Sequence, residues 1–196
     1  MRSYSIIGGV DGVGKSSFAG VLTGACADLG PMIDTGKITA ELGDLSADKT
    51  AVDQLIRHYF ECGSSFVQEF TLSGRSPQLI AQKARKLGYT IRLHYIALDS
   101  LQECEARIRN RVKRGGHNIA PNDVERQFEE RWSAVWKTLP YCDEAEFYDN
   151  DNGFVKVAEY RNGELFPIGD YRPQWLDELI KTTESFKKRS TPPPIA

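Results

Sequence analysis

Residues 9–17 constrain this chain more than any other part of it. They read G-V-D-G-V-G-K-S-S and satisfy the pattern GxxxxGK[ST] of a phosphate-binding loop. An apolar run at 4–8 precedes them, and a segment with helical spacing of apolar residues follows, so the motif has the strand–loop–helix context that it requires. A dinucleotide-binding turn would need GxGxxG, and the third glycine is lacking after Gly12 and Gly14. The sequence therefore predicts a loop that wraps around phosphate groups.

Each residue type in this loop has its own role toward a nucleoside triphosphate. Glycines let backbone N–H groups approach an anion, and the helix N-terminus adds further donors. Lys15 is expected to carry positive charge to the β- and γ-phosphates, Ser16 to bind Mg²⁺, and Ser17 to donate to the α-phosphate. The predicted cofactors are ATP and Mg²⁺. The expected nucleotide-binding residues of the loop are Gly9, Asp11, Gly12, Val13, Gly14, Lys15, Ser16 and Ser17.

Short apolar runs alternate with segments that have apolar residues every three or four positions, which is typical of a mainly parallel sheet covered by helices. Strands are expected at 4–8, 31–34, 65–71, 90–98 and 146–149, with a hairpin from 155–160 and 164–168. Helices are expected at 15–28, 49–61, 77–87, 100–113, 122–138 and 174–186. We therefore expect a three-layer α/β/α P-loop NTPase fold, with one domain at 1–187, a helical lid at about 111–126 and a flexible tail at 188–196.

Composition excludes several classes of protein. The length of 196 residues suits one domain, and 25 Lys and Arg against 27 Asp and Glu leave a net charge of −2. Such a balance argues against a duplex-DNA binder, which needs a basic excess. The four cysteines lie far apart, without the spacing of a zinc site or a disulfide framework. The chain begins with no signal peptide and contains no membrane-spanning run, so we expect a cytoplasmic protein without a membrane partner.

Three acidic residues fall at or near the ends of predicted strands. Asp34 follows the second strand, where a carboxylate can accept a hydroxyl proton or hold a metal through water, although a helix cap or a loop carboxylate would look the same. Glu69 lies within an apolar run and is therefore either linked to metal or substrate or locked in an ion pair. Asp99 has the setting of a Walker B carboxylate, but Ser100 starts the next helix and capping explains it equally well.

A dense run of basic residues at 107–114 ends in two glycines, which indicates a lid that carries arginines over phosphates. We expect Arg111 and Arg114, next to the glycines, to serve this purpose. Arg107 and Arg109 are expected on a solvated helix face, where cations complement the helix C-terminus. Arg126 and Arg131, on the following helix, either complete the clamp or pair with neighbouring glutamates.

Two further residues are candidates for contact with a substrate. Arg75 follows a flexible Ser-Gly pair, from which its side chain is expected to reach a substrate phosphate. His117 follows the two glycines of the lid run, and it either touches the substrate or packs and caps locally.

These residues together resemble the zeta-toxin family of P-loop kinases, in particular the short bacterial homologues described as UDP-N-acetylglucosamine kinase-like. The resemblance covers about 6–163. Beyond the phosphate loop it rests on the F-x-x-E-x-T-L-S-G-R run at 66–75, the R-V-x-x-G-G-H run at 111–117 with Pro121, Val124, Arg126 and Phe128 downstream, Leu98-Asp99-Ser100, and Y-D-N at 148–150.

The resemblance implies a P-loop fold of the nucleoside- and nucleotide-kinase type and ATP-dependent phosphorylation of a hydroxyl on a UDP-amino sugar such as UDP-N-acetylglucosamine. It implies a catalytic set of Lys15, Asp34, Arg114 and Arg126, a nucleotide contact from Arg111, and substrate contacts from Glu69, Thr71, Arg75 and His117. Asp34 could instead be the aspartate that precedes the base by two residues, which would leave Gly36 at the base position. Two other functions stay open: a kinase for another small alcohol or nucleoside, and a nucleotide-gated binding protein with an antitoxin as its partner.

Overall fold

The computed structural model describes residues 2–25, 29–34 and 45–190 of the chain. Its elements follow the predicted alternation of strands and helices. They are β1 (Ser3–Gly8), α1 (Lys15–Ala25), β2 (Met32–Ile33), α3 (Leu45–Cys62), β3 (Phe66–Phe70), α4 (Ser76–Lys86), β4 (Thr90–Ala97), α5 (Leu101–Lys113), α6 (Pro121–Thr138), the 3₁₀ turn η1 (Leu139–Tyr141), β5 (Glu144–Asp149), β6 (Val155–Arg161), β7 (Glu164–Pro167) and α7 (Gln174–Ser190). Among the described residues, no helix combines the length and apolar character needed to cross a membrane.

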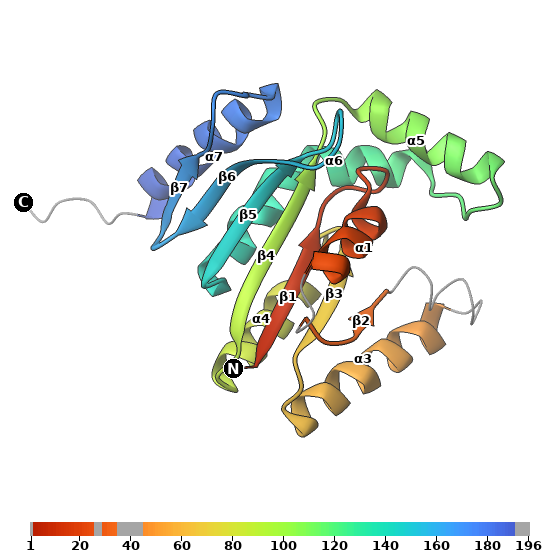
Figure 1. Ribbon diagram of the computed structural model, residues 1–196, viewed down its shortest axis with the longest axis vertical. Coiled ribbons are helices and arrows are strands. Elements are labelled where there is room, and N and C mark those ends of the chain that lie inside the picture. The colour runs from red at the N-terminus through yellow and green to blue at the C-terminus, as the bar shows by residue number, and fades with distance from the viewer. Residues whose placement is uncertain (1, 26–28, 35–44, 191–196) are drawn as a thin grey trace, which may run out of the picture.

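All strands belong to one seven-stranded sheet in the order β2-β3-β1-β4-β5-β6-β7 (Figure 1). The strands β2, β3, β1, β4 and β5 run parallel, and β6 and β7 continue the sheet antiparallel. In the central strands Gly8 is in register with Phe70 of β3 and Tyr95 of β4. The carboxyl ends of β3, β1 and β4 therefore meet at one edge, which is where ligands bind in parallel α/β sheets.

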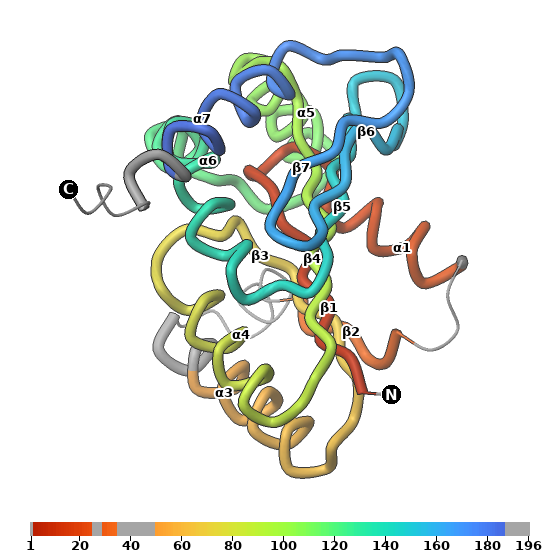
Figure 2. The backbone as a smooth tube through the Cα atoms, turned by 90° about the vertical axis from the view of Figure 1, so that its left-hand side faces the viewer, coloured from red at the N-terminus to blue at the C-terminus, as the bar shows by residue number. Residues whose placement is uncertain are grey.

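Helices cover both faces of the sheet, as the three-layer prediction requires. α1 lies on one face, while α3, α4, α6 and α7 lie on the other (Figures 1 and 2). The larger core fills the space between the sheet and these four helices, and its largest fully buried side chains are Trp175, Tyr4, Tyr95, Phe66 and Phe147. A second core lies under α1 and α5, around Phe18 and Ile96. Burial of these apolar side chains is the main force that holds the layers together.

The local signals for helix ends behave largely as predicted. Gly88 follows α4 with a φ of 76°, and Ser100 caps α5 by accepting a hydrogen bond from the backbone of Glu103 at 3.1 Å. α7 continues to Ser190, four residues beyond the expected end of this helix at 186. Residues 191–196 and the T-G-K run at 35–37 lie outside the described residues.

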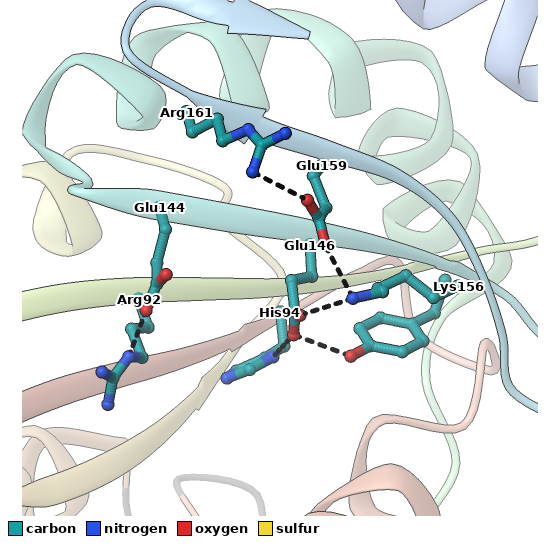
Figure 3. A network of polar contacts seen from close by, with 8 residues as sticks. Arg92, His94, Glu144, Glu146, Lys156, Glu159 and Arg161 are labelled. Atoms are coloured by element: carbon teal, nitrogen blue, oxygen red, sulfur yellow. Dashed lines mark hydrogen bonds and ion pairs between the residues drawn. The ribbon is translucent and has the colours of Figure 1, made fainter. Parts of the chain in front are cut away.

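A polar network occupies β4, β5 and β6 on the side of the sheet that carries α1 (Figure 3). Glu146 accepts hydrogen bonds from Tyr148 at 2.7 Å and Lys156 at 3.1 Å, and its Oε2 lies 3.0 Å from Nδ1 of His94. The His94 contact, with support from Tyr148 and Lys156 against the opposing effect of burial, lowers the pKa of Glu146 to about 2. Lys156 also binds Glu159 at 2.7 Å. This part of the sheet is therefore covered by paired charges.

Candidate active site

A cleft of about 590 Å³ opens at the carboxyl edge of the central strands. Residues of the phosphate loop (residues 9–17) and of α5 line it, and Figure 1 shows that the segment between β1 and α1 lies near α5. The cleft is lined by Asp11, Gly12, Gly14, Lys15, Ser16, Ser17, Glu69, Arg107, Ile108, Asn110, Arg111, Arg114, Gly116 and Asn150. The structure therefore brings the predicted loop and the predicted lid arginines together, although they lie about a hundred residues apart in sequence.

The glycines of the loop are needed for packing as well as for phosphate approach. Gly12 and Gly14 have φ angles of 91° and 99°, in the left-handed region that favours glycine. A Cβ on Gly12 would lie 2.3 Å from the backbone oxygen of Cys104 in α5, and one on Gly14 would lie 2.6 Å from Nδ2 of Asn150. The loop is thus in direct contact with α5 and with the end of β5.

Lys15 lies within the loop with only 7% of its surface exposed. Its Nζ donates to the backbone oxygens of Gly9 at 3.0 Å and Val10 at 3.2 Å, and to Oδ1 of Asp11 at 3.1 Å. The ammonium group therefore lies at the loop surface that faces the cleft. A triphosphate in the cleft would offer it stronger anionic partners than two neutral carbonyl groups.

Glu69 and Ser16 bring two side-chain oxygens together on the floor of the cleft. Oγ of Ser16 donates to Oε1 of Glu69 at 3.1 Å, while Oε2 is buried without a hydrogen-bond partner in the described part of the chain. Burial, together with the charge of Asp34, raises the pKa of Glu69 against the opposing effects of Lys15 and Ser16. The two side chains fit Mg²⁺, which prefers hard oxygen ligands and takes few from the protein when phosphates supply others. Among the described residues no group of three or more His, Cys, Asp and Glu forms a separate metal site.

Asp34, the expected base, follows β2 and is half-buried. It does not line the cleft in the described structure, but its charge acts on Glu69 on the neighbouring strand. Asp34 is therefore placed close to the cleft floor. Its catalytic role stays a prediction.

Three arginines line the cleft beside the loop: Arg107 and Arg111 of α5, and Arg114, which caps the C-terminus of that helix. Arg107 and Arg111 are four residues apart, which places them on one face of the helix. Arg107 corrects a prediction, because it was expected on a solvated face and instead donates to the backbone oxygen of Asn150 at 2.8 Å. Arg109 lies on an exposed face outside the cleft, as expected, and it pairs with Glu105 at 3.5 Å. Arg111 binds the backbone oxygen of His117 at 3.3 Å, and its Nε is buried without a partner among the described residues.

Several predicted site residues lie away from this cleft in the described structure. Arg126 is exposed on α6 and pairs with Asp123 at 2.7 Å, so its place in the clamp stays a prediction that requires the lid to move. Arg131 is buried and forms an ion pair with Glu178 of α7. Its predicted pairing with glutamates of its own helix is therefore not the arrangement seen in the structure. Thr71, Arg75 and His117 are absent from the cleft lining, and their substrate contacts also stay predictions.

Asp99 is a capping residue here. Its Oδ1 accepts the backbone N–H of Trp175 at 2.9 Å, at the start of α7. The carboxylate that reaches Ser16 is instead Glu69, on the strand next to β1. Of the two interpretations of Asp99, the structure therefore supports capping, although it caps α7 and not the helix that follows it.

Sequence reasoning missed residues that hold the loop from a distance. Nδ2 of Asn150 donates to the backbone oxygen of Val13 at 2.8 Å, and Gln127 of α6 makes two hydrogen bonds to Asp11. The Y-D-N run at 148–150 indicates that a strand ends near Asn150, but it does not indicate that Asn150 contacts the phosphate loop. Nothing in the spacing around Gln127 sets it apart from other polar residues of an amphipathic helix.

Comparison with known proteins gives one sequence relative. No protein-family model matches the chain. An uncharacterized protein of Haemophilus influenzae is 33% identical over 87 residues, which cover 44% of this chain and 61% of the relative. The chain thus spans about three-fifths of the relative's length, and the match assigns no activity.

Solved structures resemble the whole chain. A chain from the PezAT chromosomal toxin–antitoxin system of Streptococcus pneumoniae is 17% identical with a TM-score of 0.59, over 96% of this chain and 87% of that one. A chain of the AvrRxo1-ORF1:-ORF2 structure with ATP is 15% identical with a TM-score of 0.64, over 100% of this chain and 65% of that one. Likeness at such identities shows the fold. The chain therefore shares its fold with these two chains.

Proposed function

We propose that this protein is an ATP- and Mg²⁺-dependent kinase that transfers the γ-phosphate to a hydroxyl group of a small molecule. One observation carries the proposal: Lys15 on the phosphate loop lines the same cleft as Arg107 and Arg111 of α5 and Arg114 at its C-terminal end. Phosphoryl transfer spreads negative charge over the transferring group, and positioned cations stabilise that charge. A site for simple phosphate binding would not need these additional cations.

The residues of the cleft divide the work of such a transfer. The loop amides, Lys15 and Ser17 would hold the phosphates, while Arg111 and Arg114 would offset the charge of the transferring group. Asp34 would accept the proton of the acceptor hydroxyl from its place beside the cleft floor. Ser16 and Glu69 would hold Mg²⁺, which when bound neutralises charge on the β- and γ-phosphates.

The acceptor that we propose is a UDP-amino sugar such as UDP-N-acetylglucosamine. Support comes from the sequence resemblance to the zeta-toxin family and from the fold shared with a chain of a toxin–antitoxin system. The same likeness supports an antitoxin protein as a binding partner. The structure with ATP is that of a complex between two different chains, which fits a nucleotide site that coexists with a partner.

A screen of acceptors with γ-labelled ATP tests the proposal. We expect label to move to a UDP-amino sugar, and the replacement Asp34→Asn to abolish transfer while ATP binding stays within about twofold, because the base acts on the acceptor and not on the nucleotide. The measurement is product labelling beside an ATP titration. Transfer to a different alcohol or nucleoside would redirect the acceptor assignment. Hydrolysis of ATP without transfer of label to any tested acceptor would contradict the proposed kinase activity.

A nucleotide-gated binding protein is the second candidate, favoured by the likeness to chains from two-component complexes. In that case ATP would control affinity for a partner without transfer of phosphate. Asp34→Asn separates the two functions. In a kinase it would abolish phosphate transfer, whereas a nucleotide-gated binding protein would transfer no phosphate in either form and would keep its partner binding and the dependence of that binding on ATP.

The raised pKa of Glu69 predicts an unusual dependence on pH. If ionised Glu69 is required, kcat/KM should fall on acidification at a pH above the ordinary carboxyl value of 4.5, and Glu69→Gln should lack this acidic limb and have low activity throughout. The stability of the folded protein should have the opposite dependence on the ionisation of Glu69: the ionised form supports activity but destabilises the fold. A folded pKa above the unfolded one gives stability at low pH that is lost as pH rises through the folded pKa, so Glu69→Gln should melt higher than the native protein at neutral pH.

These two readouts are a pH profile of kcat/KM and thermal melts at acidic and neutral pH. Glu125→Gln, an exposed position on α6, is the matched control and should change neither. An acidic limb that persists in Glu69→Gln would assign it to another group.

A further inference from the structure

One residue of α6 uses both ends of its side-chain amide on a single residue of the phosphate loop. The backbone N–H of Asp11 donates to Oε1 of Gln127 at 3.0 Å, and Nε2 of Gln127 donates to Oδ2 of Asp11 at 3.0 Å. The partners are 116 positions apart in sequence, and Gln127 is only 8% exposed. A partly buried reciprocal pair of this kind fixes both the backbone and the side chain of its partner, and breaking it leaves the buried amide of Gln127 without these partners.

The same aspartate also holds the lysine of the loop. Its second oxygen, Oδ1, lies 3.1 Å from Nζ of Lys15. Burial works to raise the pKa of Asp11, but Lys15 and the hydrogen bond from Gln127 outweigh it and lower the pKa, so the carboxylate stays charged. The orientation of Lys15 therefore depends on Asp11, and the orientation of Asp11 depends on Gln127.

We propose that Gln127 is a positioning residue that sets the phosphate loop, through Asp11, in the geometry that receives a triphosphate. The inference rests on the proposed function, since it concerns the nucleotide half of the same site. It also makes α6 part of that site, because Gln127 lies on α6. A short segment joins α6 to α5, which carries Arg107 and Arg111. If α6 were displaced by a movement of the lid, the contacts from Gln127 to Asp11 and from Asp11 to Lys15 would change the position of the Lys15 side chain.

A charge-swapped double variant tests the pair. Gln127→Glu alone places two carboxylates face to face, and Gln127→Ala removes both hydrogen bonds. Asp11→Asn combined with Gln127→Glu restores two hydrogen bonds, because the amide introduced at position 11 can donate to the carboxylate introduced at position 127, which still accepts the backbone N–H. Coupled partners show such recovery in a double-mutant cycle, and independent residues do not.

Two measurements are made on each variant: the ATP dissociation constant by titration, and hydrogen exchange of the backbone amides of residues 9–17 without nucleotide. We expect Gln127→Glu and Gln127→Ala to weaken ATP binding by about 10-fold and to speed exchange in the loop, and the double variant to return to within about threefold. KM for ATP should rise more than kcat falls. Glu130→Ala, exposed on the same helix, is the control and should leave both readouts unchanged.

The outcomes separate this inference from the proposed function. A glutamine that only supports the fold would lower the melting temperature but leave ATP affinity and loop exchange at native values, and that result would overturn the inference while the kinase stands. With Asp11→Asn alone measured beside them, a double variant that binds ATP no better than the separate effects of Asp11→Asn and Gln127→Glu combined would also overturn it. If the native protein binds no ATP, the proposed function fails, and the exchange of residues 9–17 in the same variants still decides whether Gln127 holds the loop.

Discussion

Replacement of Lys15 by alanine should weaken ATP binding by about 10- to 100-fold and reduce phosphate transfer by a further 10²- to 10³-fold. The first effect corresponds to the loss of a charged hydrogen-bond donor to the phosphates, and the second to the loss of a positioned cation while charge develops on the transferring group. Lys15 is the side chain that the structure holds at the loop surface, 3.0 Å from the Gly9 oxygen and 3.1 Å from Asp11. ATP titration and single-turnover transfer measure the two effects separately.

The matched control is Lys137→Ala, which removes an exposed lysine of α6 far from the cleft lining. It should change neither affinity nor transfer. A melting curve of Lys15→Ala belongs beside these data, because the variant leaves the Asp11 carboxylate without its cation. Native ATP affinity in a folded Lys15→Ala protein would contradict the assignment of the site.

Gly12→Ala should damage both stability and nucleotide binding. The added methyl group would lie 2.3 Å from the backbone oxygen of Cys104, and the residue would keep a φ of 91° that alanine strongly disfavours. The strain and the overlap each cost about 1–3 kcal/mol, and the clash is with backbone, so it can be relieved only by moving the loop away from α5. We expect a loss of about 2–5 kcal/mol in the free energy of unfolding, measured by denaturant titration, with ATP affinity reduced in the protein that remains folded.

Gly20→Ala provides the contrast within the same segment. Gly20 lies inside α1 with ordinary φ, and a methyl group there would meet no described atom within 4 Å. Alanine has the higher helix propensity, so this change should stabilise the protein by about 0.5–1 kcal/mol and leave ATP binding intact. Equal effects from the two substitutions would mean that the contact between Gly12 and Cys104 does not form.

The fold could be predicted from the sequence because its strongest signals are local. The phosphate-loop pattern fixes the order strand, loop and helix, and the alternation of apolar runs gives the parallel part of the sheet. Element boundaries differ mainly where the chain has no sharp stop. α7 illustrates this, because no glycine or proline follows position 186 before Pro192 and the helix continues to Ser190.

The site could be predicted only in part, because much of it is built from contacts between distant residues. Lys15, Ser16, Arg111 and Arg114, which their motifs predict for the site, line one cleft. The supporting contacts of Gln127 and Asn150 involve single polar residues more than a hundred positions from the loop, and no spacing rule reaches that far. Asp99 shows the opposite difficulty, since an apolar run followed by Asp and Ser fits both a metal ligand and a cap until the position of Trp175 is known.

Attachment of the loop to α5, Gln127 and Asn150 has a consequence for the order in which the protein becomes functional. Ribosomes deliver the N-terminus first, so a nascent chain that has reached only the end of β4 already carries the whole GxxxxGK[ST] motif but lacks all three attachments. The last of these attachments can form only when β5 and Asn150 have been made and have joined the sheet. Newly made chains therefore contain the motif long before the contacts that hold its loop can form.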